Sequence, residues 1–183
     1  MKRRILFFCI SAGVLLCDQL SKQWAATALN RPYGSPREIK VISNLLSFAY
    51  TQNWGIALGL LGDGGSPTKW ILVAVSTAAV IFVTGYLLRA SKNDKLLMTA
   101  LSLLLAGILG NLVDRLTHGY VIDFITFHHN EWTFPVFNLA DTAISCGAAL
   151  MAIDLFRNKQ TENATPPQPA SEQSVNPIGQ VES

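Results

Sequence analysis

Four long apolar blocks, almost free of charge, dominate the sequence and limit what the chain can fold into. They cover residues 5–17, which continue past Asp18 as an amphipathic stretch towards Leu29, and then 70–88, 96–113 and 136–153. A helix needs about 20 mostly apolar residues to cross a hydrocarbon core of roughly 30 Å. Because barrel strands alternate between apolar and polar residues and these blocks do not, we expect an all-α membrane protein with four transmembrane helices.

The composition agrees with this reading and excludes other classes of protein. Hydrophobic residues make up 50% of the chain and charged residues only 14%, and the mean hydropathy is +0.31. Intrinsic disorder needs low hydrophobicity, so it is excluded for most of the chain. The net charge of +2, with no basic stripe, also argues against a nucleic-acid partner.

The first block has a second possible interpretation, as a cleaved signal peptide with a basic start and an apolar core. Residues 14–17 resemble a lipoprotein cleavage box, but Leu16 stands where a small residue is required. No other small-residue cleavage site follows, so we expect the first block to be retained as a span.

Basic residues at the ends of the blocks predict the orientation. Eight lie close to span ends on one side: Lys2, Arg3, Arg4, Arg89, Lys92, Lys95, Arg157 and Lys159. Six are spread over the longer connections of the other side: Lys22, Arg31, Arg37, Lys40, Lys69 and Arg115. The positive-inside rule then predicts that both termini are cytoplasmic and that the two longer loops, 30–69 and 114–135, face outward.

The loops and the tail complete the predicted organisation. Alternating apolar residues at 46–51 indicate a short strand, so the outer loop region is expected to contain β structure. The glycine-punctuated, apolar stretch at 55–65 is expected to lie on the lipid interface. We expect a single membrane domain over residues 1–157 and a disordered, polar cytoplasmic tail over residues 158–183, which contains four prolines.

Four aspartates gather at the outward ends of the blocks, where ionisable groups are functional candidates by default. These are Asp18, Asp114, Asp123 and Asp141. If Asp123 and Asp141 meet, they can share one proton, so that one carboxylate accepts a proton from water while the other polarises a carbonyl. The same pair could carry protons in a transporter, and spacing alone does not decide between the two.

The neighbouring polar residues have both functional and structural interpretations. Asn138 lies three residues before Asp141, on the same helical face, and Asn111 shares a face with Asp114. Arg115 adds a cation beside them, as a supporting or lipid-headgroup contact. Asp18 and Lys22 are spaced for an i,i+4 salt bridge, which serves either the site or the anchoring of the helix.

Other chemistries find little support in the sequence. The three histidines lack the spacing of a zinc site, and the three cysteines fall in membrane blocks without a C-x-x-C pair. Ser21 and Lys22 are adjacent, which directs their side chains apart on a helix. We therefore expect no metal and no cofactor.

Five short motifs together resemble the bacterial lipoprotein signal peptidases, the signal peptidase II family. They are Asp18-Gln19-Leu20-Ser21-Lys22, Thr51-Gln52-Asn53-Trp54-Gly55-Ile56-Ala57, Gly107-Ile108-Leu109-Gly110-Asn111-Leu112-Val113-Asp114-Arg115, the run Gly119, Val121, Asp123 and Phe124, and Phe137-Asn138-Leu139-Ala140-Asp141. The resemblance covers residues 1–157, with one departure at Leu58, where many members have phenylalanine.

The resemblance implies an intramembrane aspartic endopeptidase with Asp123 and Asp141 as its catalytic pair. It implies supporting or substrate-contacting roles for Asp18, Lys22, Asn53, Gly55, Asn111, Asp114, Arg115 and Asn138. The implied substrates are diacylglyceryl-modified prolipoproteins, cut before the lipidated cysteine by a lipid-embedded monomer. The implied location is the bacterial inner membrane, with the active site near the outer leaflet.

Two alternatives remain open from the residues themselves. A proton-coupled transporter predicts acids spread across the depth of the membrane, whereas the four acids gather at one end. A scaffold without catalytic activity gives no reason for an aspartate at position 141 inside an apolar helix, and it predicts that Asp141→Asn has no effect.

Overall fold

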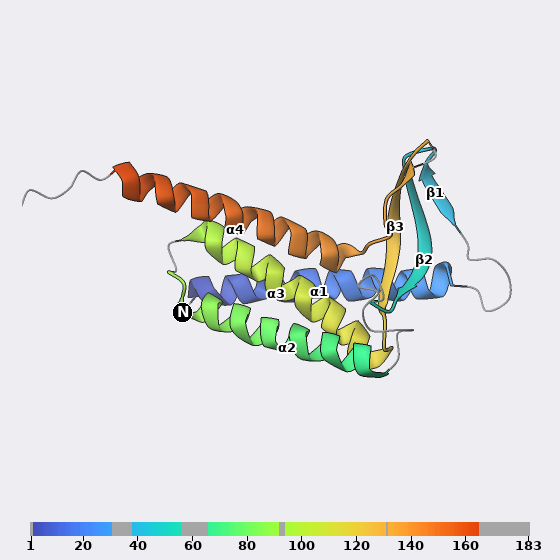
Figure 1. Cartoon of the computed structure of the whole chain (residues 1–183), viewed down its shortest axis with the longest axis horizontal. Coiled ribbons are helices and arrows are strands. Elements are labelled where there is room, and N and C mark those ends of the chain that lie inside the picture. Colours follow the sequence, from blue (N-terminus) through green and yellow to red (C-terminus); the bar gives the residue numbers. More distant parts are fainter. Residues whose placement is uncertain (1, 31–37, 56–65, 92–93, 131, 165–183) are drawn as a thin grey trace, which may run out of the picture.

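Four long helices lie side by side, and a small sheet stands across one end of the bundle (Figure 1). The computed structural model describes residues 2–30, 38–55, 66–91, 94–130 and 132–164. The helices are α1 (Lys2–Ala28), α2 (Ser66–Arg89), α3 (Lys95–Thr117) and α4 (Leu139–Ala164). Each contains a stretch long and apolar enough to cross a membrane. The predicted four-span helical fold is therefore confirmed.

Helix α3 lies at the centre of the bundle, in contact with α1, α2 and α4. Buried apolar side chains join α1, α2 and α3 towards the end far from the sheet; they include Phe7, Leu87, Met98 and Leu101. The contact between α3 and α4 depends on small residues, because a Cβ at Gly107 would collide with the backbone oxygen of Ala140. Close backbone approach of this kind is a common basis of helix packing in membranes.

The sheet has four antiparallel strands in the order β1-β2-β3-β4. They are β1 (Ile39–Ile42), β2 (Leu46–Asn53), β3 (Val121–His129) and β4 (Trp132–Thr133). The predicted strand at 46–51 is confirmed as β2, whereas the other three strands were not anticipated. The register pairs Thr51 with Asp123 and Asn53 with Val121, so β2 brings Asn53 beside the aspartate of β3.

An apolar cluster fixes the sheet to the C-terminal end of α1. Ala25 of α1 and Leu29, which directly follows the helix, are buried with Ile122 and Phe124 of β3. The ring of Trp24 extends this contact, because its centroid lies 5.5 Å from that of Phe48 in an edge-on arrangement. The orientation of β3 is thereby tied to α1, which matters for the site described below.

The ends of α4 differ from the sequence expectation. The helix begins at Leu139 rather than at residue 136, because Phe137 pairs with Ile125 of β3 through backbone hydrogen bonds instead of joining the helix. Asn138 is consequently the N-terminal cap of α4 and not part of its helical face. At the other end α4 continues to Ala164, beyond residue 157.

The start of α1 and the end of α4 both lie at the end of the bundle away from the sheet (Figure 1). The expected disordered tail lies outside the described residues from position 165 onward. The glycine-rich stretch expected at the lipid interface also lies outside the described residues, except for Gly55. Leu58 lies outside them as well.

Candidate active site

Asp123 lies near the start of β3, opposite Thr51 of β2, and is only 2% exposed. Its two carboxylate oxygens accept hydrogen bonds from two amide side chains. Asn138 Nδ2 donates to Oδ1 at 2.6 Å, and Asn53 Nδ2 donates to Oδ2 at 2.9 Å. Burial is the largest influence on this group and raises the pKa of Asp123 to about 6; the nearby carboxylate of Asp141 also raises it, while the two amide donors and Lys22 lower it.

Asp141 lies in the first turn of α4 and is part of a reciprocal cap. Its backbone N–H donates to Asn138 Oδ1 at 2.9 Å, and the backbone N–H of Asn138 donates to Asp141 Oδ2 at 3.3 Å. This is the geometry of a capping box, in which two unpaired helix-end donors are satisfied at once. The other oxygen, Oδ1, accepts a hydrogen bond from Asn111 Nδ2 at 2.8 Å.

Asn138 connects the two aspartates. It caps the helix that carries Asp141, and its side-chain amide donates to Asp123. The expected meeting of residues 123 and 141 is therefore present as two carboxylates that share one asparagine. The same side chain lies 3.3 Å from Asn111 Oδ1, so its orientation is fixed from two sides.

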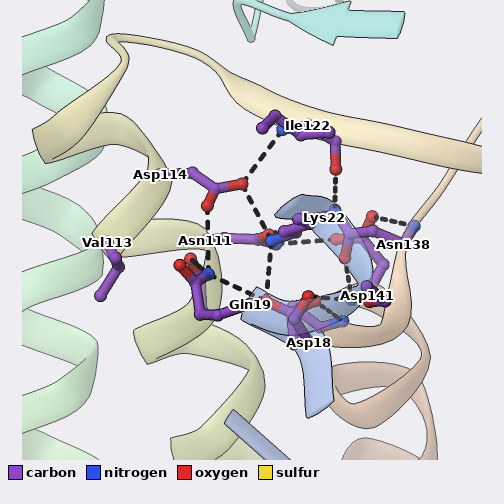
Figure 2. A network of polar contacts seen from close by, with 12 residues as sticks. Asp18, Gln19, Lys22, Asn111, Val113, Asp114, Ile122, Asn138 and Asp141 are labelled. Atoms are coloured by element: carbon purple, nitrogen blue, oxygen red, sulfur yellow. Dashed lines mark hydrogen bonds and ion pairs between the residues drawn. The ribbon is translucent and has the colours of Figure 1, made fainter. Parts of the chain in front are cut away.

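A buried charge cluster lies next to Asn138 and Asp141 (Figure 2). Lys22, 1% exposed, lies 2.9 Å from Asp18 Oδ2 and 3.0 Å from Asp114 Oδ2. Its ammonium also donates to Asn111 Oδ1 at 3.0 Å. The predicted i,i+4 pair of Asp18 and Lys22 is thus present, and the shared face predicted for Asn111 and Asp114 is directed at Lys22.

Gln19 is a site residue that the sequence analysis missed. Its amide nitrogen lies 3.1 Å from Asp114 Oδ1 and 3.2 Å from Asp18 Oδ2, so it bridges the two carboxylates of the cluster. It also lies 3.2 Å from the backbone oxygen of Gly110. Gln19 follows Asp18 directly in the first motif, but a single polar residue on a helix gives no other signal of such a bridge.

Arg115 and Gly55 lie at the edge of the site. Arg115 Nη1 lies 3.4 Å from the backbone oxygen of Asn111, and its charge acts on Asp141, Asp114 and Asp123. Gly55 donates its N–H to Asn53 Oδ1 at 2.9 Å, which orients the asparagine that contacts Asp123. Its φ of 76° lies in the left-handed region that favours glycine.

A mostly apolar cavity opens beside Asp141 and has a volume of about 400 Å³. It is lined by Phe134, Pro135, Val136, Phe137, Asp141, Thr142, Ser145 and Cys146. A carboxylate at the wall of an apolar hollow is the arrangement expected of a site that binds an apolar ligand next to a reactive group.

Comparisons with known proteins agree on one family. The sequence profile described as signal peptidase (SPase) II matches residues 10–157. The lipoprotein signal peptidase of Pseudomonas fluorescens is 40% identical over 164 residues, which cover 88% of this chain and 93% of the relative. The enzyme of the same name from Pseudoalteromonas atlantica is 33% identical over 157 residues, 86% of this chain and 93% of the relative.

Solved structures give the same result. A bacterial membrane enzyme superposes with a TM-score of 0.75 at 27% identity, covering 88% of this chain and 93% of that chain. A second bacterial membrane enzyme structure gives a TM-score of 0.73 over 84% and 94%. With a family profile that spans most of the sequence and relatives of this similarity, the chain belongs to the signal peptidase II family.

Proposed function

We propose that this peptidase is an intramembrane aspartic endopeptidase in which Asp123 and Asp141 act together on the scissile bond. The observation that carries the proposal is the pair of carboxylates joined through Asn138. Asp123 is the buried member with the raised pKa and serves as the proton donor. Asp141 accepts N–H donors at both oxygens and serves as the ionised partner.

The chemistry follows from one shared proton. Asp141 takes a proton from a water molecule as the water oxygen attacks the peptide carbonyl, and Asp123 donates its proton to the carbonyl oxygen. In the tetrahedral intermediate Asp123 takes a proton back from a hydroxyl group, while Asp141 protonates the departing amide nitrogen. The C–N bond breaks, one water molecule has been added, and the pair returns to its starting protonation state.

The substrate proposal combines the family with the geometry. The relatives are named lipoprotein signal peptidases, and the apolar cavity opens beside Asp141 at the sheet end of the bundle. We infer that the substrate is a diacylglyceryl-modified prolipoprotein, cut before its lipidated cysteine. The enzyme is a multi-pass protein of the bacterial inner membrane. Both termini are proposed to be cytoplasmic, the site to lie near the outer leaflet, and the enzyme to act as a monomer among membrane lipids.

Cleavage of a defined prolipoprotein by purified enzyme in detergent tests this proposal. The modified and the unmodified precursor are compared, with and without a metal chelator, and mass spectrometry locates the cut. We expect cleavage of the modified precursor alone, immediately before the lipidated cysteine and unaffected by chelator. Cleavage that requires a metal, or equal cleavage of both precursors, would contradict the proposal, and a folded enzyme that cuts neither would favour the transporter alternative.

A further inference from the structure

The backbone N–H groups of Ile122 and Ala140 each donate a hydrogen bond to a buried carboxylate. Ile122 precedes Asp123, and its N–H donates to Asp114 Oδ2 at 3.0 Å. Ala140 precedes Asp141, and its N–H donates to Asp18 Oδ1 at 2.8 Å. The residue directly before each proposed catalytic aspartate is therefore held by another acid.

The two holding carboxylates meet at a single ammonium group. Lys22 lies 2.9 Å from Asp18 Oδ2 and 3.0 Å from Asp114 Oδ2. A third contact runs to Asn111, which donates in turn to Asp141. Figure 2 shows Lys22 between these partners, with Ile122 on one side and Asn138 and Asp141 on the other.

Lys22 itself cannot reach a substrate, since its side chain is 2% exposed. An ammonium buried to this degree is costly unless it is paired and all its donors are satisfied. Its three acceptors, Asp18, Asp114 and Asn111, provide that pairing. The three belong to α1 and α3, whereas the segments held through them are β3 and the start of α4.

We propose that Lys22 is a positioning residue that couples the strand carrying Asp123 to the first turn of the helix carrying Asp141. Through Asp114 it fixes β3 at Ile122, and through Asp18 it fixes α4 at Ala140. One side chain thereby sets the relative position of the two carboxylates that act in concert. This role rests on the proposed function only where it concerns catalysis, because the mechanical coupling exists whatever the chemistry.

Hydrogen exchange resolved to β3 and to the first turn of α4 tests the coupling without using activity. Asp114→Asn is expected to speed exchange mainly at Ile122, and Asp18→Asn mainly at Ala140. Lys22→Met is expected to speed exchange at both. Leu101→Ala is the matched control, since Leu101 is 1% exposed in the core cluster at the other end of the bundle. Faster exchange at one segment only, or at neither, in Lys22→Met would overturn the proposal.

Kinetics on the same variants test the catalytic consequence. Small misplacements of reacting groups cost on the order of 10²-fold in rate. We expect Lys22→Met to lower kcat by about that factor and to leave KM within roughly twofold of wild type. Leu101→Ala is expected to keep its kcat per folded molecule. A Lys22→Met enzyme with unchanged kcat, or with a change in KM alone, would overturn the positioning role. A wild-type enzyme that cleaves nothing would instead refute the proposed function. The hydrogen-exchange result would then decide the coupling by itself.

Loss of one buried cation can also prevent folding, so a charge-balanced variant is included. Lys22→Met combined with Asp114→Asn leaves the summed formal charge of Asp18, Lys22 and Asp114 unchanged while removing the link. Faster exchange at both segments is still expected in this double variant. Normal exchange at both would show that Lys22 supplies charge balance only and would contradict the coupling.

Discussion

Replacing Asp123 by asparagine is predicted to stabilise the protein at neutral pH while removing its activity. The buried carboxyl has its pKa raised from 3.8 to about 6. Each unit of that difference corresponds to about 1.4 kcal/mol, so the ionised form costs the folded state about 3 kcal/mol at pH 7. An asparagine side chain at this position would carry no charge and would avoid this cost.

Part of that gain is offset by a lost hydrogen bond. Both oxygens of Asp123 accept from amide nitrogens, of Asn138 and of Asn53, and an asparagine offers only one oxygen. The amide nitrogen of the new asparagine then faces the amide nitrogen of Asn138 or Asn53, and this lost hydrogen bond costs about 1–2 kcal/mol of folding free energy. The net expectation at pH 7 is a stabilisation of about 1–2 kcal/mol.

The pH dependence has a definite sign. The folded state of the wild type binds the Asp123 proton more tightly than the unfolded state does, so wild-type stability falls as the pH rises from about 4 to about 6. The advantage of Asp123→Asn should therefore be present at pH 7 and absent at pH 4. Thermal unfolding in detergent, followed by tryptophan fluorescence at both values, measures the difference.

Glu38→Gln serves as the control. The Glu38 side chain is 42% exposed and forms a solvent-exposed ion pair with His128 at 3.6 Å, so the change should shift the unfolding temperature little. An Asp123→Asn protein that is less stable than wild type at pH 7 would show that the ionised Asp123 carboxylate does not destabilise the folded state. So would a difference of equal size at pH 4 and pH 7.

Three further predictions follow from the same contacts. Gly107→Ala should lower the free energy of unfolding by the ~1–3 kcal/mol typical of overpacking, because its Cβ would collide with Ala140. Gly13→Ala is the control and should not lower it, because a Cβ there would meet nothing within 4 Å. The value of kcat/KM should fall as the pH rises through about 6, since Asp123 must hold its proton; a rate that is flat from pH 5 to 8 would argue against that role. Asn111→Ala should slow cleavage at least about tenfold, because it removes the hydrogen bond to Asp141 and also the acceptor used by Lys22 and Asn138. A rate within twofold of wild type would contradict this.

The sequence predicted the bundle because hydrocarbon leaves few choices for long uncharged blocks. It also grouped the acids correctly at one end, since charge at membrane depth is rare enough to be informative. The i,i+4 spacing of Asp18 and Lys22 identified their contact, because that pair lies within one helix.

Long-range pairing is what the sequence did not predict. Strand β3 carries Asp123, yet its sequence shows no clear alternation of apolar and polar residues, because residues 121–124 are all buried whichever face of the sheet they occupy. The bridge made by Gln19 and the backbone contacts of Ile122 and Ala140 join elements far apart in the chain. No local pattern encodes such contacts, so they became visible only in the fold.

Cleavage by two single variants is the most direct test that Asp123 and Asp141 form one catalytic pair. Asp123→Asn and Asp141→Asn are purified beside wild type, checked for folding by thermal unfolding, and assayed on the modified precursor. We expect each variant to lose activity by at least the ~10²–10⁴-fold typical of a lost general acid or base. Retention of more than about a tenth of the wild-type rate by either folded variant would contradict it.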